Sequence, residues 1–374
     1  MNLAYKYRMY PNKSQKILLA KTFGCVRFLW NKKVEFWRDK EPIKTSTELR
    51  NEYDFLQEVS AGALQQKERD FREYAKQIFS KSRKTRIGDP SFKSRKSRQS
   101  YRLPNQKFKV IGNKIQLEKI GLIRIVADRE YEGKLISVTV SKDKCGDYYA
   151  SVLVETATRP KPKTGNSVGI DVGLKGLITT SDGLQINHFP DNQRKIKHIQ
   201  RHLSRKVNGS RRHNELKLRL NKLYRQEQRK REWILHNISK FLVDNYDVIV
   251  TEDLNVSGMM KNHKLAGAIG RASWSKLFRQ IEYKTILYGR EHAQVDRFYP
   301  SSKMCSACGQ IKENLALKDR IYKCDCGHVE DRDKNAAKNI KAGGAPSAIQ
   351  SVMGSQAYSG SPRQAFPVEL MNFL

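Results

Sequence analysis

Three acidic residues stand where a carboxylate is costly to bury unless a cation accompanies it. Asp171 and Glu252 each end an apolar run typical of a buried strand, and Asp333 lies in the first turn of the last predicted helix. Paired Mg²⁺ ions satisfy such carboxylates. Two ions about 3.5–4 Å apart can activate a water and stabilise the leaving oxygen of a phosphodiester. We therefore predict that these three acids hold two Mg²⁺ ions, or Mn²⁺, in a nuclease site.

The prediction rests on the three acids as a set, because a single Asp at a strand end is more often a cap or an ion-pair partner. Intervals of 81 residues separate them, so only the fold can bring them together. Asp331 is the nearest alternative to Asp333. Two residues span about 200° of a helix, so only one of this pair can face the site. We favour Asp333, because Asp-x-Asn-Ala-Ala leaves small residues at 336 and 337 for close packing on a sheet.

Four cysteines form two close pairs, each followed by glycine. Cys305 and Cys308 make the first pair, and Cys324 and Cys326 follow after hairpin-like sequence. Four thiolates in this pattern are typical of a tetrahedral structural Zn²⁺ site of the ribbon type, with buried or redox-active thiols as the alternative. One residue separates the second pair where two are usual. We therefore expect a strained knuckle, with His328 as a substitute ligand if Cys326 cannot reach.

The charge of the chain predicts a polyanionic partner. Its 72 Lys and Arg residues against 38 Asp and Glu give 72 − 38 = +34, and nucleic acids are the usual bacterial polyanions that neutralise such a surplus. Basic residues concentrate in segments 81–109 and 190–232, the first of which also carries aromatic residues that could stack on bases. A solvated basic face is the alternative. The basic residues that we expect to contact nucleic acid are Lys93, Arg95, Lys96, Arg98, Arg201, Arg205, Arg211 and Arg212.

The length of 374 residues predicts about two or three domains, and 38% hydrophobic residues can fill their cores. No apolar run approaches the roughly 18 residues that span a bilayer, and the first residues lack a signal-peptide core. We expect a cytoplasmic bacterial protein associated with the nucleoid.

The apolar pattern changes along the first half of the chain. Residues 3–10 predict a strand and residues 13–80 predict helices. Residues 81–109 read as a partly ordered basic connector. Short alternating runs over 110–156 then predict a small antiparallel barrel that the first strand could join, followed by a Pro- and Lys-rich linker at 158–165.

The second half positions the candidate acids and cysteines. A buried strand at 167–171, a hairpin and a third strand begin an RNase H-like sheet. Residues 191–245 predict a basic helical hairpin that breaks at Asn208-Gly209 and projects from the sheet. The remaining expected elements are a buried strand at 247–253, a helix at 273–290, a strand at 294–298, a helix at 331–341 and a disordered tail at 342–374.

Four short sequence strings together resemble one protein family. They are Gly169-Ile170-Asp171-Val172-Gly173, Glu252-Asp253-Leu254, Pro300-Ser301-Ser302 and the run Asp331-Arg332-Asp333-Lys334-Asn335-Ala336-Ala337. The chain resembles TnpB, the RNA-guided nucleases encoded by bacterial insertion sequences and related to type V CRISPR effectors. The resemblance covers about residues 5–340, and one departure from it is the Cys-x-Cys pair.

The resemblance implies an α+β multidomain fold: a wedge β-barrel domain, a helical recognition lobe with the basic connector, a RuvC-like (RNase H-like) nuclease domain and an inserted zinc ribbon. The wedge domain would comprise residues 1–10 and 108–160, and the recognition lobe residues 11–107. The nuclease domain would comprise residues 161–299 and 331–341, with the zinc ribbon at 300–330 and the tail at 342–374.

The resemblance also implies the activity. A guide RNA from the element's own transcript would occupy the basic channel and pair with one strand of double-stranded target DNA, while the protein reads a short adjacent motif. Gln65 would lie on the motif-reading helix, and its amide suits an adenine edge.

Two other functions use the same features. A DDE-type transposase would employ the acids for strand transfer without RNA. A nuclease-dead, RNA-guided DNA-binding repressor would retain only binding, although the intact Asp171, Glu252 and Asp333 argue against it. The sequence leaves the oligomeric state open.

Overall fold

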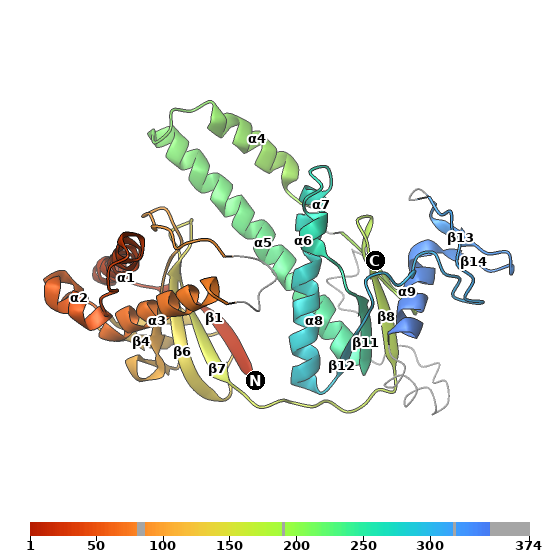
Figure 1. Ribbon diagram of the computed structural model, residues 1–374, viewed down its shortest axis with the longest axis horizontal. Helices are drawn as coiled ribbons and strands as arrows, with labels where there is room; N and C mark the ends of the chain where they lie inside the picture. The colour runs from red at the N-terminus through yellow and green to blue at the C-terminus, as the bar shows by residue number, and fades with distance from the viewer. Residues whose placement is uncertain (81–86, 189–190, 317–318, 345–374) are drawn as a thin grey trace. The chain divides into compact units, whose positions relative to one another are not determined.

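The computed structural model describes residues 1–80, 87–188, 191–316 and 319–344, and the chain divides into two compact units, Met1–Ala157 and Thr158–Leu374 (Figure 1). Each unit has its own sheet and core, and each is described by itself. The tail expected to be disordered lies outside the described residues from 345 on, as do residues 81–86 of the basic connector.

The N-terminal unit is built on a seven-stranded antiparallel sheet of order β2-β6-β7-β1-β5-β4-β3. The first strand of the chain lies inside this sheet, paired with β7 on one side and β5 on the other. The strands are β1 (Asn2–Tyr10), β2 (Gln99–Pro104), β3 (Phe108–Ile111), β4 (Lys114–Leu117), β5 (Gly121–Val126), β6 (Lys134–Lys142) and β7 (Tyr148–Glu155). The order has β2 and β3 at its two edges, and the barrel predicted from the sequence pattern stays a prediction.

Strand β2 corrects the expectation that residues 81–109 are a connector throughout. Tyr101 and Leu103 point into the core, whereas Arg102 between them forms an ion pair with Asp70 at 2.6 Å. The strand pairs along its whole length with β6. Basic residues flank it on the N-terminal side and conceal its short apolar alternation in the sequence.

Helices pack on this sheet. They are α1 (Lys13–Asp39), α2 (Ser46–Glu52), the 3₁₀ turn η1 (Asp54–Glu58) and α3 (Ala61–Ile78). A capping box of Asn12 and Gln15 begins α1. Trp30 of α1 and Phe71 of α3 form an edge-to-face pair with ring centroids 5.2 Å apart, so the two long helices pack against each other.

The C-terminal unit is built on a five-stranded sheet of order β10-β9-β8-β11-β12. Its strands are β8 (Ser167–Val172), β9 (Gly176–Thr180), β10 (Gln185–Asn187), β11 (Val248–Glu252) and β12 (Glu291–Val295). β8, β9 and β10 are antiparallel in succession, whereas β11 runs parallel to both β8 and β12. Because β8 and β11 are parallel, their carboxyl ends lie at the same edge of the sheet. β12 begins three residues before the strand expected at 294–298, directly after the turn that ends the preceding helix.

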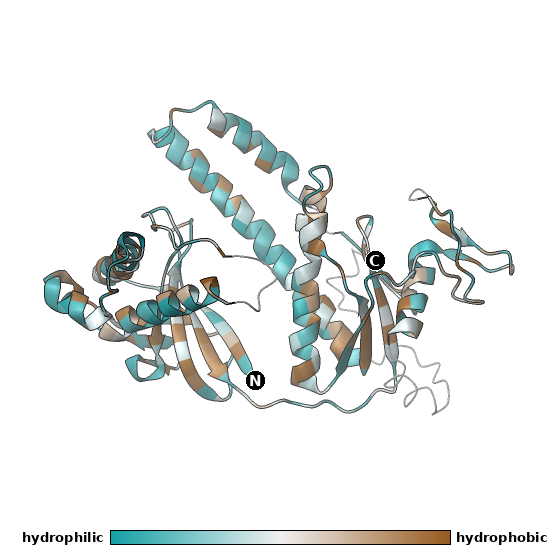
Figure 2. Ribbon diagram, in the orientation of Figure 1, coloured by the Kyte–Doolittle hydropathy of each residue, from teal (hydrophilic) through white to brown (hydrophobic). Residues whose placement is uncertain are grey.

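The helices of this unit are α4 (Gln193–Ser204), α5 (Arg211–Asn245), α6 (Val256–Met259), α7 (Ala266–Ala272), α8 (Trp274–Tyr288) and α9 (Arg332–Gly343). α4 and α5 form a hairpin that extends away from the sheet, and Figure 2 shows that its projecting part is mainly hydrophilic. The predicted break at Asn208-Gly209 lies between them. Only the last third of α5 enters the core, packed on α8. Within the described part of the chain, no helix is both long and apolar enough to cross a membrane.

Candidate metal centres

Strand register places two of the candidate acids side by side. Thr251 of β11 pairs with Ile170 of β8, so the next residues, Glu252 and Asp171, lie on neighbouring strands at the same sheet edge. Burial raises the pKa of Asp171 well above its ordinary value, and the negative charges of Glu252 and then Asp333 add to the rise. Glu252 and Asp333, both distant in sequence, therefore act electrostatically on Asp171.

Helix α9 brings Asp333 to this edge by lying very close to β8. A Cβ atom on Gly169 would sit 2.1 Å from the carbonyl oxygen of Ala337, so only glycine allows the observed approach. Ala336 and Ala337 are fully buried at the contact. This is the close packing of small residues that the Asp-x-Asn-Ala-Ala pattern predicts.

Asp331, the alternative to Asp333, has a different task. It is the N-cap of α9, and its Oδ1 accepts hydrogen bonds from the backbone N–H groups of Asp333 at 3.0 Å and Lys334 at 3.1 Å. Gln185 also donates to Oδ1, at 3.4 Å. The Asp331 carboxylate thus satisfies the helix end, and the Asp333 carboxylate is the one that raises the pKa of Asp171.

The three carboxylates are spread more widely than the ligands of a single ion. Among the described residues, only the cysteine cluster brings three or more His, Cys, Asp or Glu side chains together with all of their ligand atoms within 4.8 Å of one another. For two ions about 4 Å apart with oxygen ligands near 2.1 Å, ligands on opposite ions can be roughly 8 Å apart. The donor set of three carboxylates supplies the oxygen ligands that hard divalent cations prefer.

Ser301 contacts the site, although the sequence pattern does not predict this role. Its Oγ donates to Oε1 of Glu252 at 2.5 Å, and its side chain is buried. Its carbonyl oxygen accepts from Nδ2 of Asn339 in α9 at 2.8 Å. Two signals could have indicated these residues: the Pro300-Ser301-Ser302 string and the spacing of Asn335 and Asn339 on one helical face.

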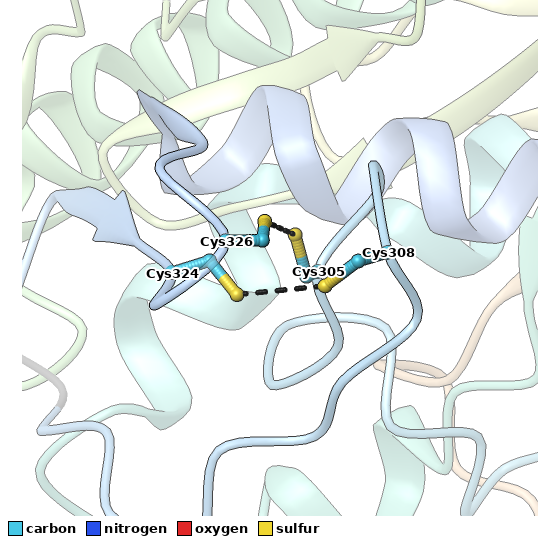
Figure 3. Close-up of side chains that lie close together, drawn as sticks. All are labelled: Cys305, Cys308, Cys324 and Cys326. Carbon is cyan, nitrogen blue, oxygen red and sulfur yellow. Dashed lines mark hydrogen bonds between the residues drawn. The ribbon is translucent and has the colours of Figure 1, made fainter.

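The four predicted cysteines come together in one cluster. Figure 3 shows Cys305 facing Cys326 and Cys308 facing Cys324, with sulfur separations of 3.8 Å and 3.6 Å. A tetrahedral Zn²⁺ with Zn–S bonds of about 2.3 Å requires sulfurs about 3.8 Å apart. The cluster thus has the ligands and spacing of a closed four-cysteine zinc site. Burial opposes ionisation of Cys305, but backbone N–H groups at Cys308 and Ala307 stabilise its thiolate and lower the pKa to about 6.

The Cys-x-Cys knuckle closes without help from histidine. Cys326 reaches the other three sulfurs. His328 instead places Nε2 3.2 Å from Oγ of Ser306 and 3.4 Å from Oε2 of Glu330. The short β-hairpin of β13 (Ile321–Lys323) and β14 (Val329–Asp331) supports the second pair, and Tyr322 of β13 is buried beneath the cluster.

Three family models and several named proteins are similar to this chain. A family model described as "Probable transposase" matches residues 148–263, one described as "Cas12f1-like, TNB domain" matches residues 274–340, and one described as "Helix-turn-helix domain" matches residues 1–40. A protein of Streptomyces pristinaespiralis named "Putative RNA-guided DNA endonuclease" is 36% identical over 361 residues, 91% of this chain and 89% of that protein. The chain belongs to the TnpB family.

Other members of the TnpB family and one solved structure extend the comparison. The protein InsQ of Escherichia coli, also named a "Putative RNA-guided DNA endonuclease", is 28% identical, with 98% of each chain covered. The "TnpB-like protein L79" of Acanthamoeba polyphaga mimivirus is 31% identical over 227 residues, 55% of this chain and 43% of that protein. The fold is similar to that in a cryo-EM structure of a Cas12f1–sgRNA–target DNA complex, with a TM-score of 0.52 at 13% identity over 91% of this chain and 98% of that one.

The basic residues of this TnpB family member fall into two groups. Most side chains expected to contact nucleic acid are exposed: Gln65 on α3, Arg95, Lys96 and Arg98 before β2, and Arg201, Arg205, Arg211 and Arg212 around the α4–α5 turn. Lys93 differs, because its Nζ lies 3.3 Å from the centroid of the Trp30 ring and its backbone bonds to the Asn31 amide. Burial and then the charge of Lys67 lower the pKa of Lys93 to about 8. Its position is that of a packed residue.

A pocket of about 600 Å³ lies between α4 and α5. Its apolar floor includes Ile199 and Leu223, which belong to the seam that joins the two helices. The polar side chains that line it are Arg194, Lys195, His198, Arg219, Lys222 and Gln226. The sequence pattern predicts the seam and the basic surface but gives no signal for a pocket.

Proposed function

We propose that this protein is an RNA-guided DNA endonuclease that hydrolyses DNA phosphodiesters with Mg²⁺ at Asp171, Glu252 and Asp333. The observation that carries the proposal is the convergence of these acids: Glu252 and Asp171 lie on neighbouring strands, and burial followed by the charges of Glu252 and Asp333 raises the pKa of Asp171. The names of the relatives support the same activity. The net charge of +34 supports a nucleic-acid partner.

The C-terminal unit is, in this proposal, an RNase H-like domain of the RuvC type. Strand β8, the hairpin to β9 and the third strand β10 are followed by a β11 that returns parallel to β8. This arrangement supports the assignment, because it brings the ends of β8 and β11 to one edge. The sequence from 300 to 330 is proposed as an inserted ribbon held by structural Zn²⁺ on the four cysteines.

The chain's own groups divide the work at the carboxylate site. When bound, a pair of divalent cations supplies an activated water and stabilises the leaving oxygen. Asp171 must first release the proton that its raised pKa favours, so it binds cations only in competition with protons. Ser301 holds one oxygen of Glu252, and Asp331 fixes the helix end from which Asp333 projects.

The partners proposed are a guide RNA from the element's own transcript and double-stranded target DNA. Base pairing with the guide would read the target, and the protein would bind the backbones through exposed cations such as Arg95, Arg205 and Arg212. Gln65, exposed on α3, is proposed to read an adenine in a short motif beside the target. The N-terminal unit would then supply the wedge domain and recognition lobe.

A second candidate function is strand transfer without RNA, favoured by the family model described as "Probable transposase". One preparation separates the two functions. The full-length protein is expressed from its native locus, its co-purified RNA is sequenced, and the complex is assayed on double-stranded DNA that matches or mismatches that RNA.

The proposed function requires Mg²⁺-dependent cleavage of matched DNA only, lost after RNase treatment. Glu252→Gln should abolish cleavage while RNA and target binding persist. Glu313→Gln is the matched control, because Glu313 is exposed on the ribbon. Activity on the ends of the element that survives RNase would support the transposase, and unchanged cleavage by Glu252→Gln would refute the site.

A further inference from the structure

The segment that leads from β12 to the first cysteine pair passes directly beside Glu252. Ser301 in this segment is 3% exposed, and its Oγ lies 2.5 Å from Oε1 of Glu252. A carboxylate that accepts a bond from a buried hydroxyl loses much of its rotamer freedom. The hydroxyl thus holds one Glu252 oxygen in place.

Two buried asparagines of α9 clamp the same segment. Nδ2 of Asn339 donates to the carbonyl oxygens of Ser301 at 2.8 Å and Met304 at 2.6 Å. Nδ2 of Asn335 donates to the Met304 carbonyl at 2.7 Å, and its Oδ1 accepts from the N–H of Ser306 at 2.9 Å. Because Asn335 and Asn339 are 0% and 2% exposed, water cannot replace these bonds without opening the contact.

The clamp connects three features that are separate in sequence. α9 carries Asp333 two residues before Asn335, and the clamped segment contains Cys305 of the cysteine cluster. The position of Ser301 therefore depends both on α9 and on the folded cluster. Through Ser301, the orientation of Glu252 depends on them too.

We propose that Ser301 is a positioning residue that orients Glu252 to bind a divalent cation, and that the Asn335–Asn339 clamp joins it to the cysteine cluster. This inference rests on the proposed function, since it assigns Glu252 to a cation. Hydrogen-bond partners of metal ligands typically change metal affinity about 10–100-fold when they are removed. Ser301 should do so without touching the cation.

The test measures Mn²⁺ binding to the full-length, RNA-free protein by electron paramagnetic resonance, alongside its zinc content and Tm. Ser301→Ala should raise the Mn²⁺ concentration for half-saturation about 10–100-fold, with zinc content and Tm close to those of the unmodified protein. Ser301→Thr retains the hydroxyl and should restore binding. Ser302→Ala is the control, because Ser302 is the adjacent serine and is only partly buried.

A double-mutant cycle distinguishes positioning from general support. In a Glu252→Gln background, Ser301→Ala should weaken Mn²⁺ binding no further, because the group that it orients is already neutral. Equal weakening in both backgrounds, or normal Mn²⁺ binding by Ser301→Ala, would overturn the proposal. If Ser301→Ala does not fold, Ser301→Cys keeps the volume with a weak donor and is judged by the same two outcomes.

Cleavage assays on DNA that matches the guide RNA distinguish this inference from the proposed function. Should the unmodified complex bind Mn²⁺ at Glu252 but cut no DNA, the proposed function fails while the role of Ser301 stands. Should the complex cut DNA with a Mg²⁺ requirement that Ser301→Ala leaves unchanged, the proposed function stands and the role of Ser301 fails.

Discussion

The carboxylate of Asp331 accepts a hydrogen bond from the backbone N–H of Asp333 at 3.0 Å, so one acid caps the helix from which the other projects. The two neighbours therefore differ in chemical role although they are both aspartates in the same turn. Their exchange would not be conservative, because a cap needs a short acceptor facing the helix end and a cation ligand needs a carboxylate facing the sheet edge.

Substitutions should separate these two roles. Asp331→Ala should lower the unfolding free energy by about 1 kcal/mol, whereas Asp331→Asn, which can still cap, should change it by only a few tenths. Asp333→Asn should reduce cleavage at least about 10³-fold with little change in Tm. Thermal melts and single-turnover cleavage of matched DNA measure both effects. Full activity of Asp333→Asn would assign the site to another acid.

Asp171→Asn should stabilise the protein when no divalent cation is added. The pKa of Asp171 is raised in the folded state, so the unfolded chain releases this proton at lower pH and the unfolding free energy falls as pH rises through the folded pKa. The amide removes that penalty, so its stabilising effect should be greatest above the folded pKa and absent below the ordinary Asp range of about pH 4. Melts across this pH range without added Mg²⁺ give the measurement. A lower Tm for Asp171→Asn at pH 8 would contradict the prediction.

The same shift predicts how cleavage depends on pH. Cation binding competes with the Asp171 proton, so the activity should decline on the acid side at a pH above the ordinary Asp range of about 4. Raising the Mg²⁺ concentration should move that decline to lower pH. Initial cleavage rates at several Mg²⁺ concentrations test this, and an acid limb that does not move with Mg²⁺ would be inconsistent with the proton on a ligand.

Zinc content should follow Cys326 and not His328. Cys326→Ser should reduce bound zinc well below one ion per chain and lower the Tm, because three thiolates hold the ion less well than four. His328→Ala should retain the zinc, since its ring contacts Ser306 and Glu330. Elemental analysis of the purified variants decides between them, and the reverse pattern would make His328 the fourth ligand.

Gly169→Ala should uncouple α9 from the sheet. The added methyl would lie 2.1 Å from the Ala337 carbonyl oxygen, so the helix must move. We expect the unfolding free energy to fall by about 2–4 kcal/mol and cleavage activity to be lost. Gly270→Ala in α7 is the matched control, because its methyl would meet Met260 at an ordinary 3.6 Å. That control should be neutral or should stabilise the helix by about 0.5–1 kcal/mol. Denaturant unfolding compares the two variants.

Substitution of Lys93 should lower stability, whereas substitution of Arg95 should weaken nucleic-acid binding. Lys93→Ala removes a cation above the Trp30 ring and should cost about 0.5–2 kcal/mol of stability. Arg95→Ala, at an exposed position, should leave the Tm unchanged, weaken RNA binding and reduce the slope of log affinity against log salt by about one. Filter binding at several salt concentrations measures this. An unchanged salt slope would remove Arg95 from the interface.

Local sequence patterns are sufficient to identify the candidate acids and cysteines. Apolar runs that end in an acid indicated Asp171 and Glu252, and paired cysteines followed by glycine indicated the cluster, because each signal spans only a few residues. The pattern was weaker where charge masked it: β2 carries its apolar alternation beside a run of cations, and the segment was expected to be a connector. Strand β12 begins three residues before the predicted strand, because the polar residues that follow Gly289 do not mark where the turn ends and the strand begins.

Sequence by itself thus determined which chemical groups this TnpB family member possesses: the acids, the thiols, the basic surfaces and most of the helices and strands around them. Tertiary structure alone decided which groups meet. The pairing of Thr251 with Ile170 puts Glu252 beside Asp171, and the buried bonds from Asn339 and Ser301 link α9 to Glu252. Such contacts join positions tens of residues apart, and their free energy depends on register and burial that no short stretch of chain encodes.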